Sequence, residues 1–191
     1  MAKVPTIACI KVSLREVRPS IWRRIELRAD AKLFELHRIV QAAMGWTDSH
    51  LHQFVQNDVS YGVSDPDFGI VRVSERRTLV SKVLRKPKDR LRYEYDFGDG
   101  WEHELVLETL ADAQPGVRYP RVLAGKRACP PEDVGGAGGY EHFLEVMRDP
   151  EHAEYEELMQ WVGGPFDPEE FDLETANGAL RGRKILVPAR G

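Results

Sequence analysis

The chain has 191 residues, of which 42% are hydrophobic and 30% charged, with a formal net charge of −4. This balance is typical of a soluble globular protein and excludes a disordered tail, a collagen-like rod and a membrane-embedded chain. There is no run of 18 apolar residues, so no transmembrane helix and no membrane partner are expected. With only Cys9 and Cys129, a disulfide scaffold is excluded, and the expected location is cytoplasmic.

Charge is distributed unevenly along the chain. Residues 1–40 carry nine Lys/Arg against four Asp/Glu, and residues 72–92 carry nine against two. Residues 132–174 carry fourteen acidic groups and a single base, Arg148. Such segregation is typical either of a face that binds an anionic partner or of two halves that attract each other across one fold. The second interpretation is favoured.

The N-terminal part of the sequence predicts a hairpin followed by a helix. Residues 7–14 form a largely apolar run, and residues 21–28 alternate with period two. Asp30 is expected to cap an amphipathic helix over residues 31–44, and Gly45 to end it. A hairpin, one main helix and then further strands predict an α+β fold with a β-grasp-like sheet, mixed or antiparallel.

Further strands are predicted over residues 50–56, 59–61, 91–95 and 101–108, because apolar and polar side chains alternate there. The Asp99-Gly100 pair between the last two is a strong signal for a tight turn. These two strands are therefore expected to form a hairpin.

The C-terminal part has a different composition. Residues 111–139 are rich in Pro and Gly and are expected to form a loop, and residues 140–182 an acidic helical subregion. Within this subregion Asp167 is expected to cap a helix. Together with a strand-rich core over residues 1–110, these parts predict a single domain over residues 1–191.

The strongest candidate for chemistry is the pair His50 and His52. Period-two geometry would place both imidazoles on one face of a strand, at a spacing that lets both bind one divalent metal. His103 could join them from another strand, and Asp96 or Asp99 could supply a carboxylate, which leaves an open coordination position. The alternative is a half-exposed sheet face beside an ordinary turn.

A second candidate is the loop that begins with Cys129-Pro-Pro-Glu-Asp133 and continues with four glycines between residues 135 and 139. Cys129 could act as a thiolate ligand or reactive thiol, beside Glu132 and Asp133, and the glycines could let the backbone approach a ligand closely. The loop lacks the Lys-Ser/Thr of a phosphate loop. A structural connection between strands and helices is the favoured interpretation.

Aromatic residues are candidates for contact with a partner. Trp22, Trp46, Trp101 and Trp161 would form a contact surface if they were exposed, and would otherwise belong to the core. Trp101, at the start of a predicted strand, and Tyr61, at the end of another, are the candidate binding residues in this group.

Several motifs occur in one order: Ile21-Trp-Arg-Arg24, Phe34-Glu-Leu-His37, Gly45-Trp46, His50-Leu-His-Gln-Phe54, Tyr93-Glu-Tyr-Asp-Phe-Gly-Asp-Gly-Trp-Glu-His103, Ala128-Cys-Pro-Pro-Glu-Asp133, Gly135-Gly136, Gly139-Tyr140, Phe166-Asp-Pro-Glu169 and Asn177. Over residues 5–181 this set resembles the plasmid Orf-3-like family, also labelled transposon-passenger or TnpR-like proteins. The resemblance implies one α+β domain, an association with plasmids and mobile elements, and no established activity. Family members often carry a second cysteine where this chain has Val134, so a two-cysteine site is not implied here.

Three functions remain open, and no oligomeric state is predicted. The favoured one is a non-enzymatic module that binds a protein or a nucleic acid. The first alternative is a hydrolase that uses a divalent metal held by His50, His52 and His103. The second alternative is an accessory DNA-binding protein that uses the basic stretches over residues 15–28 and 72–92.

Overall fold

The computed structural model describes residues 4–182, and within them eight strands form one sheet in the order β5-β4-β3-β6-β7-β1-β2-β8. The strands are β1 Thr6–Leu14, β2 Trp22–Arg28, β3 His52–Gln56, β4 Val59–Gly62, β5 Val73–Ser74, β6 Arg90–Tyr95, β7 Trp101–Asp112 and β8 Arg121–Lys126. The helices are α1 Leu33–Met44, α2 Val80–Val83, α3 Gly136–Met147, α4 Tyr155–Val162 and α5 Leu173–Gly182, and η1 Pro66–Phe68 is a short 3-10 helix. All neighbouring strands are antiparallel except β4 and β5.

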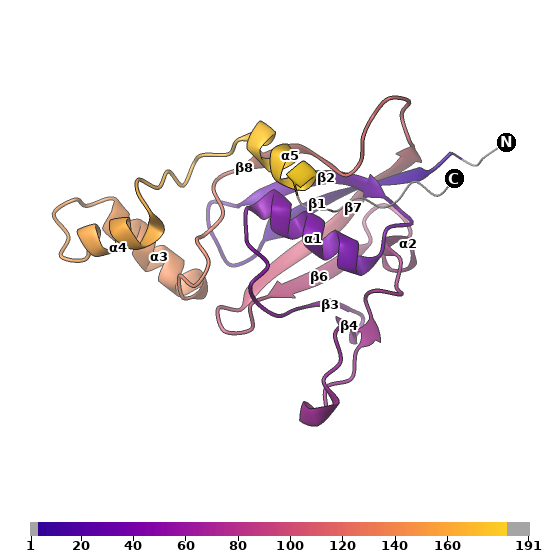
Figure 1. Cartoon of the computed structure of the whole chain (residues 1–191), viewed down its shortest axis with the longest axis horizontal. Helices are drawn as coiled ribbons and strands as arrows, with labels where there is room; N and C mark the ends of the chain where they lie inside the picture. The colour runs from indigo at the N-terminus through magenta and orange to yellow at the C-terminus, as the bar shows by residue number, and fades with distance from the viewer. Residues whose placement is uncertain (1–3, 183–191) are drawn as a thin grey trace.

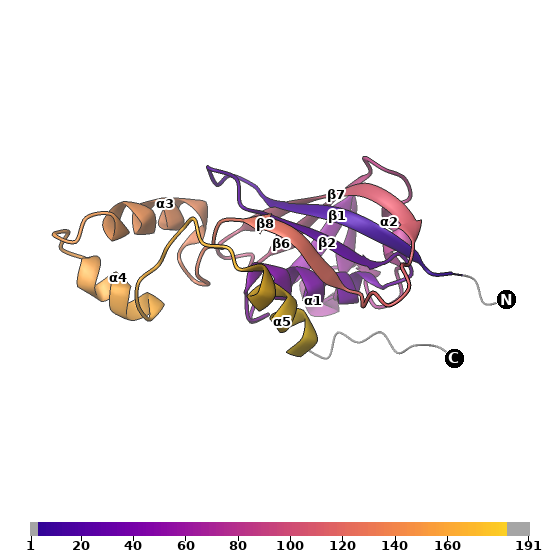
Figure 2. The same ribbon diagram turned by 90° about the horizontal axis from the view of Figure 1, so that it is seen from above.

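Helix α1 lies on one face of the sheet, with α5 beside it on the same face (Figures 1 and 2). Its apolar stripe, which includes Leu36 and Val40, is fully buried against sheet residues such as Ile10 and Leu105. This burial is the main source of stability for the fold, because each apolar side chain removed from water contributes about 1.5–3 kcal/mol. Gly45 ends α1 in the left-handed conformation, as predicted.

The start of α1 differs from the prediction. The helix begins at Leu33, and the backbone N–H of Lys32 donates to the Glu35 carboxylate at 2.7 Å. Asp30 instead forms an ion pair with Arg28 at 2.7 Å. The N–H groups of Leu33 and Phe34 donate to the carbonyls of Thr78 and Glu75 at 2.9 and 3.4 Å, so the start of the helix is satisfied without Asp30 as its cap.

The α+β class is confirmed, and the two predicted hairpins are present as β1–β2 and β6–β7. The β-grasp-like arrangement is not confirmed. Strand β1 lies between β2 and β7 and is antiparallel to both, in a sheet whose only parallel pair among the described residues is the short β4–β5 pair.

Strand β8 lies in the region that was predicted to be loop. Its Gly125 has room for no side chain, because a Cβ there would come within 2.6 Å of the Phe171 ring. The ring belongs to a segment far along the chain, so the packing that makes this glycine suitable in a strand is not visible locally. The expected loop over residues 111–139 therefore contains the edge strand of the sheet.

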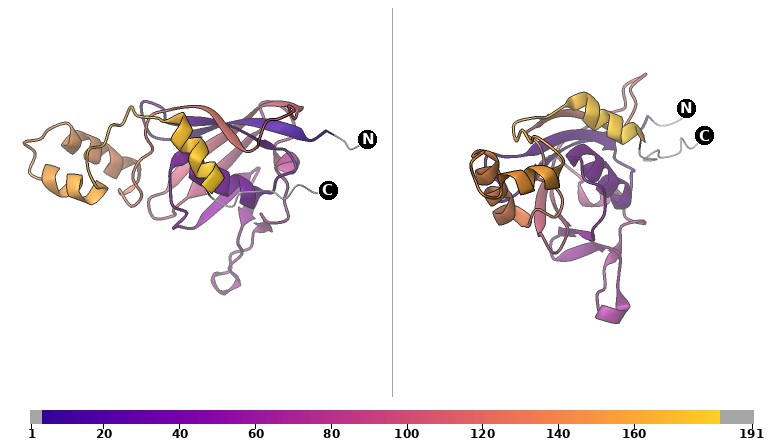
Figure 3. Two further views of the ribbon diagram at one scale, coloured as in Figure 1. Left: turned by 45° about the horizontal axis from the view of Figure 1, so that its top comes forward. Right: turned by 60° about the vertical axis from the view of Figure 1, so that its left-hand side comes forward.

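The acidic helices α3 and α4 form a lobe at one end of the sheet, and the β4–β5 connection with η1 extends away from the body (Figures 1 and 3). Helix α3 begins at Gly136, so the glycine-rich segment supplies its first turn. The helix expected after Asp167 begins only at Leu173, because Asp167 instead accepts the Glu169 N–H in a turn. In the described part of the chain, no helix is long and apolar enough to cross a membrane.

Candidate functional site

Three connections meet at one place: the β6–β7 turn, the α1–β3 connection and the segment after β8. The Trp46 indole N–H donates to the Pro130 carbonyl at 2.9 Å. The backbone N–H of Gly135 donates to the Asp99 carboxylate at 3.1 Å. Segments far apart in the sequence are therefore tied together at one place.

These connections bring together His50, Asp96 and Asp133, which we call the loop site. His50 Nδ1 lies 3.7 Å from Asp96 Oδ2, and His50 Nε2 lies 3.2 Å from Asp133 Oδ1. One ligand atom from each residue falls within 4.8 Å of the other two. His50 Nε2 is shielded from solvent and makes no hydrogen bond with described residues, because Asp133 lies outside hydrogen-bonding geometry.

The backbone orients Asp96 toward this point. Its φ of 54° is unusual for a residue other than glycine, and its Oδ1 accepts the Gly98 N–H at 2.9 Å. The second oxygen, Oδ2, is left facing His50. Asp99, by contrast, uses its carboxylate to hold Gly135, so it belongs to the support of the site.

Glu132 anchors the segment after β8. Its carboxylate accepts a hydrogen bond from the Thr47 backbone N–H at 3.1 Å and short hydrogen bonds from the hydroxyls of Thr47 and Tyr95. Burial and the nearby Glu132 raise the pKa of Tyr95, so its hydroxyl stays a donor. Because its carboxylate accepts three hydrogen bonds, Glu132 is held in place, and this fixes the position of the next residue, Asp133.

The structure does not bring the three histidines of the predicted metal site together. Strand β3 begins only at His52, so His50 lies in the preceding connection and the period-two argument does not apply to it. Among the described residues, the two groups that could hold a metal are the loop site and a group of His37, Asp48 and His52. Neither group includes His103.

The second group belongs to a closed ring of hydrogen bonds between α1 and the sheet. Gln41 Nε2 donates to the Tyr93 hydroxyl at 2.9 Å, which lies 2.8 Å from His37 Nδ1. His37 Nε2 lies 2.6 Å from Asp48 Oδ1, and the Asp48 N–H donates to Gln41 Oε1 at 3.1 Å. Each of the four residues finds its hydrogen-bond partners within the ring, so a structural role accounts for the network.

His52 lies outside this ring of hydrogen bonds and contacts it through His37. Its imidazole stacks on that of His37, with ring centroids 3.4 Å apart, and its Nε2 lies 2.8 Å from the buried Glu75 carboxylate. Burial and the neighbouring His52 lower the pKa of His37 to about 4. The sequence signal for His37 is its place on the apolar side of α1, four residues after Leu33.

His103 is fully buried and packs edge-on against Trp46, at 5.2 Å between ring centroids. Both of its ring nitrogens lack a hydrogen-bond partner among the described residues. Burial lowers its pKa to about 3, so the imidazole is neutral at physiological pH. Its surroundings are those of a core residue.

The candidate binding residues occupy different environments. Trp101 is buried, and Tyr61 is half-buried against the core. Burial raises the pKa of Cys129 to about 12, which keeps its thiol protonated in the metal-free protein. Of the four tryptophans, Trp46 is also buried and Trp161 is 46% exposed, so the four do not form a common contact surface.

The glycines after Asp133 allow close approach of backbone to backbone. Gly136 has a φ of +69°, and a Cβ there would overlap the Asp99 carbonyl oxygen. This contact joins the start of α3 to the β6–β7 turn. The segment therefore acts as the structural connection that the sequence favoured.

The basic stretches are partly neutralised by ion pairs within residues 4–182. Of their fourteen basic residues, four pair with glutamates of the sheet (Arg15, Arg24, Arg90 and Arg92), and Arg28 pairs with Asp30. None of these glutamates lies in residues 132–174, so attraction between the basic and acidic segments is not what pairs them. Paired arginines are also poorly suited to bind a phosphate backbone.

Comparison with known proteins places this arrangement in a family. The profile of the plasmid pRiA4b ORF-3-like proteins matches residues 6–175. An uncharacterised protein, y4hQ, from Sinorhizobium fredii (strain NBRC 101917 / NGR234), is 39% identical over 175 residues, which cover 91% of this chain and 88% of that protein. The crystal structure of MM3350, a protein of unknown function from Methanosarcina mazei Go1, has a TM-score of 0.81 at 38% identity and covers 90% of this chain and 98% of its own. With a matching profile over most of its length, this chain belongs to the plasmid pRiA4b ORF-3-like family.

Proposed function

We propose that this protein is a binding module that recognises its partner through one divalent metal ion at the loop site. The observation that carries the proposal is the convergence of His50, Asp96 and Asp133 from three separate connections. An imidazole with two carboxylates is a donor set suited to first-row divalent metals such as Mn²⁺, Fe²⁺ or Zn²⁺. The two negative charges of Asp96 and Asp133 would balance the double positive charge of the ion.

The exposure of the ligands supports a role in binding. The Asp96 side chain is 11% exposed and that of Asp133 is 70% exposed, so one side of the site is held by the protein and the other faces solvent. An ion with three protein ligands keeps open positions there. A carboxylate or phosphate of a partner could occupy them.

The residues next to the ligands support a macromolecular partner. Leu51 and Phe97, which directly follow His50 and Asp96 in the chain, are 71% and 46% exposed. The Arg72 guanidinium lies 5.7 Å from the centre of the Phe97 ring. Exposed apolar and cationic side chains next to the ligands in the chain would suit a partner that presents an anionic group beside an apolar one.

Metal binding can be tested by isothermal titration of the purified protein with Mn²⁺ and Zn²⁺. The wild-type protein should bind one ion per chain, and His50→Ala and Asp96→Asn should each weaken binding by roughly 10–100-fold. His142→Ala is the matched control, because His142 is an exposed histidine on α3 that pairs with Glu154. Equal binding by His50→Ala and the wild type would refute the site.

The same titrated samples distinguish binding from catalysis. A hydrolase that uses this ion would cleave phosphomonoester or phosphodiester substrates when loaded with metal, and His50→Ala would abolish the cleavage. Such a result would replace the binding module with a metal-dependent hydrolase. A metal-loaded protein that captures a partner without cleaving these substrates supports the binding module.

A further inference from the structure

Opposite charges gather at the two ends of the molecule. Helices α3 and α4 lie at one end of its long axis, and α2 lies at the other (Figures 1 and 2). Residues 136–164, which we call the acidic lobe, carry seven Asp/Glu and a single base, Arg148. Residues 76–89, which we call the basic end, carry six Lys/Arg and a single acid, Asp89. Because these segments lie at opposite ends, they cannot neutralise each other within one chain.

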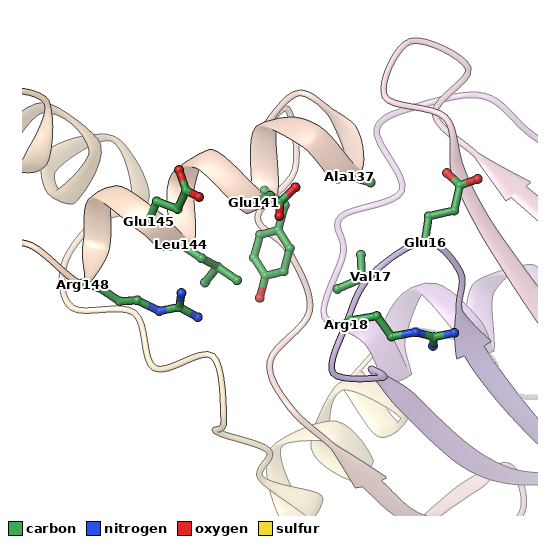
Figure 4. A pocket seen from close by; sticks show the side chains of 9 residues that line it. Glu16, Val17, Arg18, Ala137, Glu141, Leu144, Glu145 and Arg148 are labelled. Carbon is green, nitrogen blue, oxygen red and sulfur yellow. The ribbon is translucent and has the colours of Figure 1, made fainter.

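The charged side chains of both ends are exposed and lack partners. The six cations of the basic end form no ion pair within residues 4–182, and Asp89 instead accepts the N–H groups of Arg85 and Lys86 at 2.7 and 3.0 Å. Figure 4 shows Glu141 and Glu145 of the acidic lobe on successive turns of α3. Five exposed glutamates of this lobe have no ion-pair partner in the described part of the chain: Glu141, Glu145, Glu151, Glu156 and Glu157.

Helix α4 presents an apolar side chain among these carboxylates. None of its eight residues is fully buried, and Trp161 is 46% exposed. The inner edge of the Trp161 ring is held by Phe143, with ring centroids 6.1 Å apart. Glu157 lies one helical turn before Trp161, so the indole and a carboxylate share one face of α4. A partly exposed tryptophan that is fixed from below is a typical anchor of protein interfaces.

The basic end has a groove that suits such an anchor. A hollow of about 370 Å³ lies between α2 and the first residues of β1. Val4 and Leu110, which are 51% and 37% exposed, supply apolar surface to it. Arg85 also lines the groove, and its other two charged residues form the Arg28–Asp30 ion pair. The groove is therefore apolar with a net positive charge, the opposite of the surface around Trp161.

We infer that copies of this chain associate head to tail, with the acidic lobe of one copy on the basic end of the next. Trp161 would enter the groove beside α2, and the glutamates around it would face Lys82, Arg85 and Lys86. Two different surfaces of one chain would meet, so each bound copy leaves a free lobe and a free basic end for the next. Open chains of copies are therefore expected rather than a closed dimer. This contact uses no residue of the loop site and needs no metal.

The test is sedimentation velocity of the purified protein at about 20 mM and about 500 mM NaCl, with EDTA in every buffer. EDTA prevents association through a metal ion, so the result does not depend on the loop site. At low salt the wild-type protein should form dimers and longer chains as its concentration rises. At high salt it should be monomeric, because dissolved ions screen contacts between exposed charges. A protein that stays monomeric at low salt at its highest soluble concentration would overturn the inference.

Two variants each block one of the two surfaces. Lys82→Glu with Lys86→Glu reverses charge at the basic end, and Trp161→Ser removes the anchor from the lobe. Each should raise the dissociation constant by about tenfold or more. Lys126→Glu with Arg181→Glu is the matched control, because it makes the same change in net charge at exposed positions of β8 and α5. Wild-type association in either blocking variant would overturn the inference, and so would an equal loss in the control.

A mixture of the two blocking variants keeps the test valid if Trp161→Ser disturbs the fold of the lobe. The Lys82→Glu/Lys86→Glu variant retains an intact lobe, and the Trp161→Ser variant retains an intact basic end. An equimolar mixture should therefore recover one contact and stop at dimers, whereas a mixture that remains monomeric would contradict the proposed pairing. Short duplex DNA is the probe for another occupant. Binding of DNA to the basic end of a protein that does not self-associate would assign this surface to nucleic acid instead.

Discussion

The side chain of Asn177, on α5, pairs with both backbone groups of Val122, on the edge strand β8. Its Nδ2 donates to the Val122 carbonyl at 3.0 Å, and its Oδ1 accepts the Val122 N–H at 3.0 Å. A side-chain amide thereby takes the place of a neighbouring strand. Exposed edges invite pairing with other chains, so this contact both fastens α5 to the sheet and blocks part of its edge.

We expect Asn177→Ala to lower the free energy of unfolding by about 1–3 kcal/mol, because two backbone groups of Val122 lose their partners. The variant should also self-associate more readily through β8. Urea unfolding and sedimentation velocity measure the two effects. Arg181→Ala, at an exposed position near the end of the same helix, is the control. A monomeric variant with wild-type stability would contradict this role.

The closed ring between α1 and the sheet should be sensitive to any missing member. His37→Phe keeps the aromatic volume but removes the imidazole partner of the Tyr93 hydroxyl and of the Asp48 carboxylate. The expected loss is about 2–4 kcal/mol, since buried polar groups without partners are costly. Chemical denaturation with the exposed His142→Phe as control measures this loss. A change below about 0.5 kcal/mol would show that the ring has little structural role.

Stability should fall in mild acid because of His37 and His103. Burial lowers their pKa values to about 4 and about 3, from an ordinary value of 6.5. Below about pH 6.5 the unfolded chain therefore takes up protons that the folded chain does not, and the free energy of unfolding decreases as pH falls toward about 4. Urea titrations across this range measure the slope.

His103→Leu should reduce that slope. It should also leave stability at neutral pH nearly unchanged or higher, because the imidazole it removes has no hydrogen-bond partner among the described residues. A steep loss of stability at neutral pH would instead indicate that His103 makes a polar interaction in solution.

The contact between Gly136 and the β6–β7 turn should tolerate no side chain. Gly136→Ala places a Cβ against the Asp99 carbonyl and forces alanine into a left-handed conformation, so we expect a loss of about 2 kcal/mol or more. Gly138→Ala is a close control on the same helix, because a Cβ there meets nothing within 4 Å. That substitution should be neutral or stabilising. Thermal unfolding of the two variants makes the comparison, and equal melting temperatures would contradict it.

Neither cysteine should react quickly with thiol reagents in the folded protein. Burial raises the pKa of Cys9 to about 11 and that of Cys129 to about 12, so little thiolate is present near neutral pH. Labelling with a chromogenic disulfide should be slow without denaturant and rapid in urea. Fast labelling of the native protein would restore Cys129 as a candidate reactive group.

Several parts of this fold were predictable because their signals are local. A largely apolar run identified β1, period-two alternation identified β2, β6 and β7, and the Asp99-Gly100 pair identified the turn between the last two. Gly45 marked the end of α1 because a helix often ends in a left-handed residue there. Strand β8 was missed because its Gly125 becomes suitable for a strand only when the Phe171 ring covers it.

Part of the loop site was likewise predictable from the sequence, and part was not. The sequence analysis placed His50 and Asp96 in one candidate metal site, but it assigned Asp133 to a separate loop. The spacing of His50 and His52 suggested a shared face, and the structure instead starts β3 at His52 and leaves His50 in a connection. Where a side chain outside a regular element points depends on contacts such as Trp46 to Pro130, which join distant parts of the chain.

By itself, the sequence determined the α+β class, most strands and the main helix, because these depend on periodicity over short distances. Only the tertiary structure decided the strand order and the contact of His50 with both Asp96 and Asp133. Each of these depends on which distant segments pack together to bury apolar surface, and that choice is made by the whole chain at once.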